Sequence, residues 1–318
     1  MDFTLLSGTA TGGNHIEAAS NGQDALSVRT TANSIVVVVA DGCSSQPHSE
    51  VGAQIIAPML TAYIEQALRK GQSLKDPRIW TYIRSLILAK ILSVATDMAG
   101  DAPVAPVLNQ YFQFTLVGMV MTPEYTVFFS RGDGMYGFNG KVITIKPEAG
   151  NRPAYIVYGL TNPDMTVDNP QLLDFDIHAI VETSDIENWW VGTDGVEEML
   201  AVLGRTVNGE KIATIESLLD DQRYHDNPKL LNRRLQQLVA ADLIGDDITL
   251  AAGRRTATPD SIEEKDEAAI DPTADDAEGD KDQGKAEAAS PAADTDADAG
   301  APASGETTDD TTDTDGER

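Results

Sequence analysis

The order of predicted elements indicates an α+β fold in which two sheets pack together with helices outside them. Helical segments come in pairs between groups of strands, whereas a doubly wound parallel sheet would alternate strand and helix strictly. Strand-like runs of β-branched and aromatic residues dominate the centre of the 318-residue chain. The fold is expected to end near residue 255, because the sequence beyond it has too few large apolar side chains to form a core.

The first half of the chain predicts two strands followed by two long helices. Strands are expected at 26–30 and 35–39, and the β-branched run of the second is typical of a strand buried on both faces. Ser49 can cap a helix that extends to about residue 70, and Pro58 is expected to kink it. Its predicted apolar stripe consists of Val51, Ile55, Met59 and Tyr63. A second amphipathic helix is expected at about 77–98, where Ile79, Ile83, Leu86 and Lys90 recur at helical spacing.

The second half predicts mostly strands. Asn139-Gly140 between two short apolar runs is the strongest local signal for a β-hairpin. Alternation over 173–181 predicts a strand with one buried face. Helices are expected at 195–203 and about 229–243. The predicted strands are 112–121, 125–130, 135–138, 141–145, 173–181, 188–193 and 248–252.

Composition divides the chain into a domain at 1–255 and a tail at 256–318. The tail carries −17 of the formal net charge of −28 and has no aromatic residue, which predicts a disordered acidic low-complexity segment. Net acidity argues against nucleic acid or a membrane as partner, although a salt-adapted host would also select an acidic surface. Cys43 is the single cysteine, so no intramolecular disulfide forms. Because neither a secretory signal nor a run of about 20 apolar residues is recognised, a cytoplasmic location is expected.

Four aspartates stand where strand-like runs meet tight turns. They are Asp41, Asp133, Asp194 and Asp246. A strand end holds a carboxylate in a fixed direction, and oxygen ligands suit magnesium, calcium or manganese. A single Asp-Gly pair is more often a turn than a ligand. Four such carboxylates together predict one cation cluster and metal-assisted hydrolysis, which Asp24 could join through water and the Gly42 carbonyl could approach closely.

Six short motifs follow one another in a fixed order. They are Asn21-Gly22-Gln23-Asp24-Ala25, Val39-Ala40-Asp41-Gly42, Phe114-Thr115-Leu116-Val117-Gly118, Gly132-Asp133, Thr193-Asp194-Gly195 and Asp246-Asp247-Ile248-Thr249. In this order and spacing, over roughly residues 7–253, the chain resembles the metal-dependent serine/threonine protein phosphatases of the 2C type, most closely their bacterial branch. The resemblance implies a four-layer α-β-β-α sandwich of two antiparallel sheets flanked by helices.

The resemblance also implies the roles of the aspartates toward two or three Mn²⁺ or Mg²⁺ ions. Asp41 would bridge two ions, one of them also bound by the Gly42 carbonyl. Asp194 and Asp246 would complete the shell of the other ion, and Asp24 would act through ordered waters. Asp133 would share a third, weaker ion with Asp194. Two ions activate a water for attack on a phosphoryl group, so no covalent phosphoenzyme is required.

Three positions depart from the family pattern. His15 stands in the region where many relatives have an arginine that clamps the substrate phosphate, so His15 is a candidate phosphate contact, with a structural role equally open. Gln23 replaces an acid of many relatives. Cys43 replaces a histidine of eukaryotic members, and it is disfavoured as a nucleophile because no activating base accompanies it. Arg152 is a further candidate phosphate contact, with a solvated loop arginine as the alternative.

The leading functional prediction is a Mn²⁺- or Mg²⁺-dependent protein serine/threonine phosphatase that acts on phosphoproteins made by a serine/threonine kinase. The missing arginine motivates an alternative, a metal-binding pseudophosphatase that binds phosphoproteins without turnover. A third hypothesis is an acidic interaction scaffold whose tail is the functional part.

Overall fold

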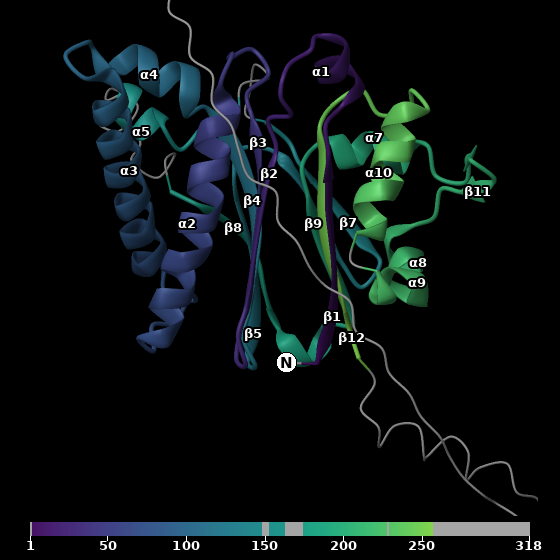
Figure 1. The fold of residues 1–318 in the computed structure, drawn as a ribbon. Coiled ribbons are helices and arrows are strands. Elements are labelled where there is room, and N and C mark those ends of the chain that lie inside the picture. Colours follow the sequence, from purple (N-terminus) through teal and green to yellow (C-terminus); the bar gives the residue numbers. More distant parts are fainter. Residues whose placement is uncertain (1, 148–152, 163–173, 228, 257–318) are drawn as a thin grey trace, which may run out of the picture. The chain divides into compact units, whose positions relative to one another are not determined.

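Two five-stranded antiparallel sheets form the centre of the computed structural model, which describes residues 2–147, 153–162, 174–227 and 229–256 (Figure 1). One sheet has the order β1-β12-β9-β6-β7 and the other β2-β3-β4-β5-β8. The first consists of β1 (Phe3–Ala10), β12 (Ile248–Arg255), β9 (Asn188–Gly192), β6 (Gly134–Phe138) and β7 (Lys141–Ile145). The second consists of β2 (Ala25–Thr30), β3 (Ile35–Gly42), β4 (Phe114–Met121), β5 (Tyr125–Arg131) and β8 (Asp176–Glu182).

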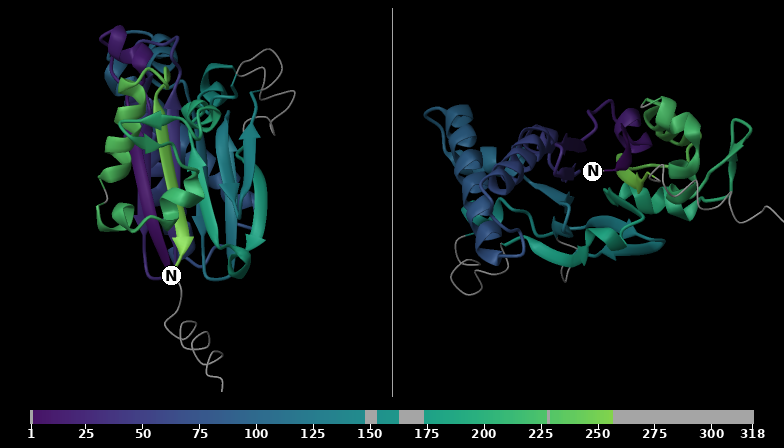
Figure 2. Two further views of the ribbon diagram at one scale, coloured as in Figure 1. Left: turned by 90° about the vertical axis from the view of Figure 1, so that its right-hand side faces the viewer. Right: turned by 90° about the horizontal axis from the view of Figure 1, so that it is seen from below.

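Helices cover the outer face of each sheet, as Figures 1 and 2 show. The β2–β8 sheet carries α2 (Ser49–Arg69), α3 (Pro77–Ala99) and α4 (Val104–Tyr111). The β1–β7 sheet carries α7 (Gly195–Ala201), α8 (Ile215–Asp220), α9 (Gln222–Asp226) and α10 (Leu230–Ala240). The short elements are α1 (Gly13–Glu17), α5 (Tyr158–Thr161), η2 (Thr183–Asp185) and the hairpin of β10 (Thr206–Val207) and β11 (Glu210–Lys211). The predicted α-β-β-α sandwich is therefore confirmed.

Three hydrophobic layers hold this sandwich together. The layer between the sheets contains Val37, Val39, Phe128, Trp189 and Val191, all fully buried. A second layer joins α2–α4 to one sheet, and a third joins α7–α10 to the other. The β-branched run of β3 contributes to two layers, because alternate side chains of a strand point to opposite faces. This double burial confirms the prediction for that strand.

The two long helices bury faces that differ from the predicted stripes. In α2 the most buried positions are Ala53, Ile56, Ala57, Leu60 and Ile64, while the predicted stripe is only partly buried at its edge. In α3 they are Trp80, Ile83, Ile87, Ile91 and Ala95. Small residues let α2 lie close to its neighbours: a Cβ on Gly52 would approach the Tyr111 carbonyl oxygen to 2.2 Å. The predicted stripe of α2 was chosen from its large apolar residues alone, so the buried face that contains Gly52, Ala53 and Ala57 was missed.

Several elements were not predicted, and one strand was placed too early. The unpredicted elements are β1, α1, α4, α5, η2, α8, α9 and the β10–β11 hairpin. β1 forms the edge next to β12, with Ala10 paired to Ile248. The strand expected at 173–181 begins at Asp176 and carries a register irregularity opposite Phe128 and Phe129. The alternating pattern located the strand but not this bulge.

By length and composition α3 could cross a membrane, which contradicts the expectation that no apolar run approaches that size. Its face of Trp80, Ile83, Ile87, Ile91 and Ala95 is buried in the helix–sheet layer. The helix also contacts α2, α4 and α5. One face of α3 is therefore packed within the domain, although only 28% of its most apolar 18-residue window is buried.

The predicted tail lies outside the described residues apart from Thr256, which is still tied to the domain. The Thr256 N–H donates to the Asp2 carbonyl at 2.8 Å. The Arg255 Nε donates to the Ile186 carbonyl at 3.1 Å, and its guanidinium lies 4.8 Å from the centre of the Phe3 ring. The described contacts therefore extend one residue past the predicted end of the domain, and the boundary itself stays a prediction.

A chain that ends at Thr256 is expected to unfold thermally at the same temperature as the full chain. A chain that ends at Gly253 is expected to lose about 2 kcal/mol or more, because the Arg255 hydrogen bonds to carbonyl oxygens disappear. Differential scanning fluorimetry of both truncations checks this. A much lower midpoint for the longer truncation would place the boundary further along the chain.

Candidate metal centre

The five predicted acidic ligands are carried to one end of the sandwich by the ends of different strands. Asp41 is the penultimate residue of β3, and Asp24 directly precedes β2. β2 and β3 pair so that Ala25 faces Ala40, which brings these two carboxylates to the same end. Asp133 lies in the turn between β5 and β6, Asp194 follows β9, and Asp246 precedes β12.

Electrostatics show that the five carboxylates form one cluster. The pKa of Asp41 is raised well above its usual range, first by burial and then by the charges of Asp24, Asp194, Asp246 and Asp133. Burial raises the pKa of Asp194 to about 6, with further contributions from Asp246 and Asp133. Asp41 is therefore near enough to the other four carboxylates for their charges to oppose its ionisation. The fold carries Asp24, Asp41, Asp133, Asp194 and Asp246 to the same end of the sandwich, and their roles as cation ligands stay a prediction.

Two of these aspartates have an oxygen atom that is buried and lacks a hydrogen-bond partner. They are Oδ1 of Asp24 and Oδ1 of Asp194. The other oxygen of Asp24 accepts a hydrogen bond from the Thr193 hydroxyl at 2.9 Å. Burial of a carboxylate oxygen without a hydrogen-bond donor costs free energy. Such an oxygen is a suitable ligand for a hard divalent cation.

This donor set fits Mn²⁺ or Mg²⁺ in composition. Within the described residues, no three His, Cys, Asp or Glu side chains are drawn together closely enough to form a ready-made metal site. The residues thus fit the predicted cations by chemistry, and the coordination geometry stays a prediction.

Asp133 lies in a tight turn between two glycines whose backbone conformations favour glycine. Gly132 has φ +95° and Gly134 has φ +131°, conformations that other residues rarely adopt. A Cβ on Gly132 would lie 2.6 Å from the Thr115 methyl carbon. The Thr115 hydroxyl hydrogen-bonds to Asp133 and lowers its pKa, while burial has the larger, opposite effect. The Gly-Asp-Gly motif is therefore a structural requirement for aiming this carboxylate.

Gly42 is required by close packing as well. A Cβ there would approach Ser49 Oγ to 2.7 Å and the Gln23 carbonyl oxygen to 2.9 Å. The Gly42 N–H donates to that carbonyl at 3.2 Å. This contact joins the segment of Asp24 to the segment of Asp41. The predicted binding of a cation by the Gly42 carbonyl stays a prediction.

His15 lies beside the cluster but turns one ring nitrogen into the protein. Its Nδ1 is 2.9 Å from Oδ1 of Asp247, a carboxylate that is almost fully buried. The contact is close, although the N–H direction is not well aligned for a hydrogen bond. Burial raises the pKa of the neighbouring Asp246, and a positive charge on His15 would partly oppose that rise. His15 therefore contacts a buried carboxylate, as its alternative structural role would require. Its contact with substrate phosphate stays a prediction.

Asp247 was missed as a functional residue by sequence reasoning. The doublet Asp246-Asp247 was the available signal, but only the first aspartate was considered as a ligand. Burial of the second could not be predicted, because its donors come from segments 224 and 235 residues away.

Cys43 is not a catalytic candidate on the described contacts, whereas the predicted phosphate contact of Arg152 is not tested. Cys43 Sγ lies 3.1 Å from Ser45 Oγ, and Tyr155 hydrogen-bonds to the same thiol. These hydroxyls do not supply the base that a nucleophilic thiolate needs. Arg152 lies outside the described residues.

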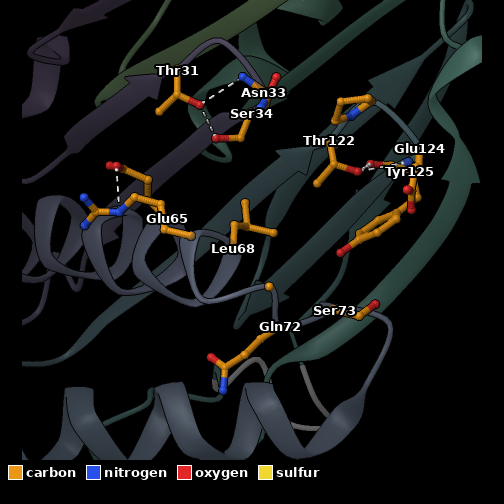
Figure 3. A pocket seen from close by; sticks show the side chains of 13 residues that line it. Thr31, Asn33, Ser34, Glu65, Leu68, Gln72, Ser73, Thr122, Glu124 and Tyr125 are labelled. Atoms are coloured by element: carbon orange, nitrogen blue, oxygen red, sulfur yellow. Dashed lines mark hydrogen bonds and ion pairs between the residues drawn. The ribbon is translucent and has the colours of Figure 1, made fainter.

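A polar cavity of about 540 Å³ lies at the other end of the β2–β8 sheet (Figure 3). It is bounded by the β2–β3 turn, the end of α2 and the β4–β5 turn, with Glu65 and Tyr125 among its lining residues. β3 begins beside this cavity at Ile35 and reaches the acidic cluster at Asp41. The cavity is therefore separate from the candidate centre. A smaller hollow of about 300 Å³ includes Asp194 and Asp246.

In the absence of divalent cations, thermal stability is expected to rise as the pH falls from 7.5 to 5. The folded pKa of Asp194 is about 6 against an ordinary value of 3.8, so its ionisation penalises the folded state above pH 6. This penalty is relieved as the pH falls from about 6 toward 3.8, where the folded protein binds the proton more tightly than the unfolded chain. Melting curves in chelator at pH 5, 6 and 7.5 measure the effect.

The Asp194→Asn variant is the control for this prediction, because it should melt higher than the parent at pH 7.5 and depend less on pH. Mn²⁺ at pH 7.5 should raise the midpoint of the parent more than that of the variant. A parent that only loses stability between pH 7.5 and 5 in chelator would contradict the electrostatic account.

A comparison with protein-family models identifies the family of the chain. The family model for protein phosphatase 2C matches residues 11–238, so the chain belongs to the protein phosphatase 2C family. The family prediction is confirmed. By sequence, no curated protein matches the chain.

Solved structures with a similar fold come from bacteria and from a protozoan. A bacterial serine phosphatase is 14% identical over 80% of this chain and 98% of its own, with a TM-score of 0.47. The serine/threonine phosphatase Stp1 from Staphylococcus aureus is 14% identical over 81% and 96%, with a TM-score of 0.46. The serine-threonine phosphatase 2C from Toxoplasma gondii is 14% identical over 80% and 95%, with a TM-score of 0.45.

Proposed function

We propose that this chain is an active protein phosphatase that uses Mn²⁺ or Mg²⁺ to hydrolyse phosphoserine and phosphothreonine in proteins phosphorylated by a serine/threonine kinase. One observation carries the proposal. The half-buried Asp41 lies within electrostatic reach of four other aspartates that come from four separate strand ends or turns. Such a concentration of like charge is unfavourable unless cations bind it.

The residues of the chain have distinct tasks in this proposal. Asp41, Asp194 and Asp246 would hold the cations, with Asp24 and Asp133 at the sides of the cluster and the Gly42 carbonyl beside Asp41. Thr193 fixes Asp24 through its hydroxyl, and the Thr249 N–H donates to that same hydroxyl oxygen at 3.0 Å. Bound cations supply an activated water and positive charge against the phosphoryl oxygens.

Substrate binding is assigned to the rim of this cluster. His15 lies on α1 close to Asp246 and Asp247, which supports a contact between its second ring nitrogen and the substrate phosphate. A neutral or protonated imidazole binds phosphate less firmly than an arginine fork. The chain is therefore expected to require a higher substrate concentration than a relative with arginine.

Phosphate release from phosphothreonine and phosphoserine peptides, with Mn²⁺ and with chelator, tests the proposal. Turnover that requires Mn²⁺ or Mg²⁺ and stops in chelator is expected, with the same dependence for p-nitrophenyl phosphate. Tight binding of the phosphopeptide without any turnover in saturating metal would refute this function and support the pseudophosphatase alternative.

A further inference from the structure

A buried carboxylate that is not among the predicted cation ligands joins three segments beside the cluster. Asp247 is 2% exposed. Its Oδ1 accepts a hydrogen bond from the Gly12 N–H at 2.7 Å and lies 2.9 Å from His15 Nδ1. Its Oδ2 accepts a short hydrogen bond from the Gln23 N–H. Both oxygens of Asp247 are therefore engaged by protein groups.

Each of these contacts ends next to a residue of the candidate centre. Gln23 directly precedes Asp24, and Asp247 directly follows Asp246. His15 is the proposed phosphate contact. One side chain thus sets the relative positions of a carboxylate at the side of the cluster and of the imidazole at its rim.

The backbone around Asp247 leaves little room for another arrangement. A Cβ on Gly12 would lie 2.2 Å from the Asp246 carbonyl carbon, and a Cβ on Gly195 would lie 2.1 Å from the Asp247 carbonyl oxygen. The Asn14 N–H donates to the Gly245 carbonyl at 2.9 Å. The turn that carries Asp246 and Asp247 is therefore enclosed between the segments that follow β1 and β9.

We propose that Asp247 is a positioning residue, which holds Asp24 for cation binding and orients His15 toward the substrate phosphate. This inference rests on the proposed function for its substrate. A carboxylate is needed because its two oxygens accept from two backbone donors and one of them also lies 2.9 Å from His15 Nδ1, whereas an asparagine would present an amide N–H₂ to one or more of these groups. The proposal places the proton of the neutral His15 ring on Nδ1, which leaves Nε2 for the substrate phosphate.

The first test reads the His15 ring directly and needs no turnover. Long-range ¹H–¹⁵N correlation spectra of the full chain in chelator, at a pH where the ring is neutral, should show the proton on Nδ1. In Asp247→Asn that preference should be lost, while Asp242→Asn should leave the spectrum unchanged. Asp242 is an exposed aspartate on the same segment with φ +56°, a conformation that asparagine tolerates. A wild-type ring protonated on Nε2 would overturn the proposal even if the Asp247 variant fails to fold.

The second test separates positioning from general stability. Asp247→Asn is expected to lower kcat/KM for a phosphothreonine peptide about 10- to 100-fold and to weaken Mn²⁺ binding in calorimetry, as loss of a ligand-orienting group does. In a double-mutant cycle, its effect on KM should largely disappear when His15 is already alanine. Full additivity with His15→Ala, or wild-type KM and Mn²⁺ affinity in a folded Asp247→Asn protein, would overturn the proposal.

The two tests also distinguish failure of this inference from failure of the proposed function. A wild-type chain that never turns over phosphopeptide removes the proposed function, yet the His15 spectrum and the Mn²⁺ affinity still decide the role of Asp247. A wild-type chain that turns over normally, with an unaltered Asp247→Asn variant, removes the role of Asp247 alone.

Discussion

Replacing Asp41 or Asp194 by alanine is expected to lower kcat/KM for phosphopeptide by about 100- to 1,000-fold or more. Each change removes a carboxylate at the centre of the cluster, whose charge interacts with those of its neighbours. Fewer cations then neutralise the charge that develops on the transferring phosphoryl group. Initial rates over a Mn²⁺ titration with a phosphothreonine peptide measure the loss.

Asp97→Ala is the matched control for these two variants, because Asp97 is exposed on α3 and takes no part in the cluster. It should keep the activity of the parent. Asp133→Ala should weaken turnover less than Asp41→Ala and leave the tighter cations bound. Full activity of Asp41→Ala or Asp194→Ala in saturating Mn²⁺ would contradict the assignment of the centre.

Gly12→Ala is expected to disrupt the centre although Gly12 is no ligand. The added methyl would meet the Asp246 carbonyl carbon at 2.2 Å, so the turn that carries Asp246 must shift. Overpacking of this kind costs about 1–3 kcal/mol, and the displaced Asp246 should weaken Mn²⁺ binding and turnover. Calorimetric Mn²⁺ affinity and the thermal midpoint check the prediction.

Gly13→Ala provides the control one residue further along. Its Cβ would lie 3.3 Å from the Ile244 carbonyl oxygen, and Gly13 begins α1, where alanine is favourable. This variant should bind Mn²⁺ and turn over phosphopeptide like the parent. Equal behaviour of the two alanine variants would show that the close approach at Gly12 does not position Asp246.

The acidic cluster could be predicted because the local sequence around each member is informative. A β-branched or aromatic run followed by Asp-Gly marks a strand end, as at Asp41 and Asp194, and strand ends are where the fold gathers these carboxylates. The sandwich followed from the order of elements. Neither prediction required knowledge of contacts between distant residues.

The parts that escaped prediction depend on contacts between distant segments. The buried face of α2 contains Gly52, Ala53 and Ala57. These small residues indicate a buried face only once the neighbouring segment that packs against them is known. The role of Asp247 depends on donors at Gly12 and Gln23, and no local pattern reports them. β1 was missed because an edge strand with mixed burial has only weak alternation.

Anomalous diffraction from a crystal of the full chain grown with Mn²⁺ tests the central claim most directly, because it locates the cations themselves. Two strong peaks are predicted among the carboxylates of Asp41, Asp194, Asp246 and Asp24, with a third, weaker peak near Asp133. Asp41 is expected to contact both strong peaks. The absence of any peak within this cluster at saturating Mn²⁺, or peaks bound elsewhere on the domain, would contradict the account.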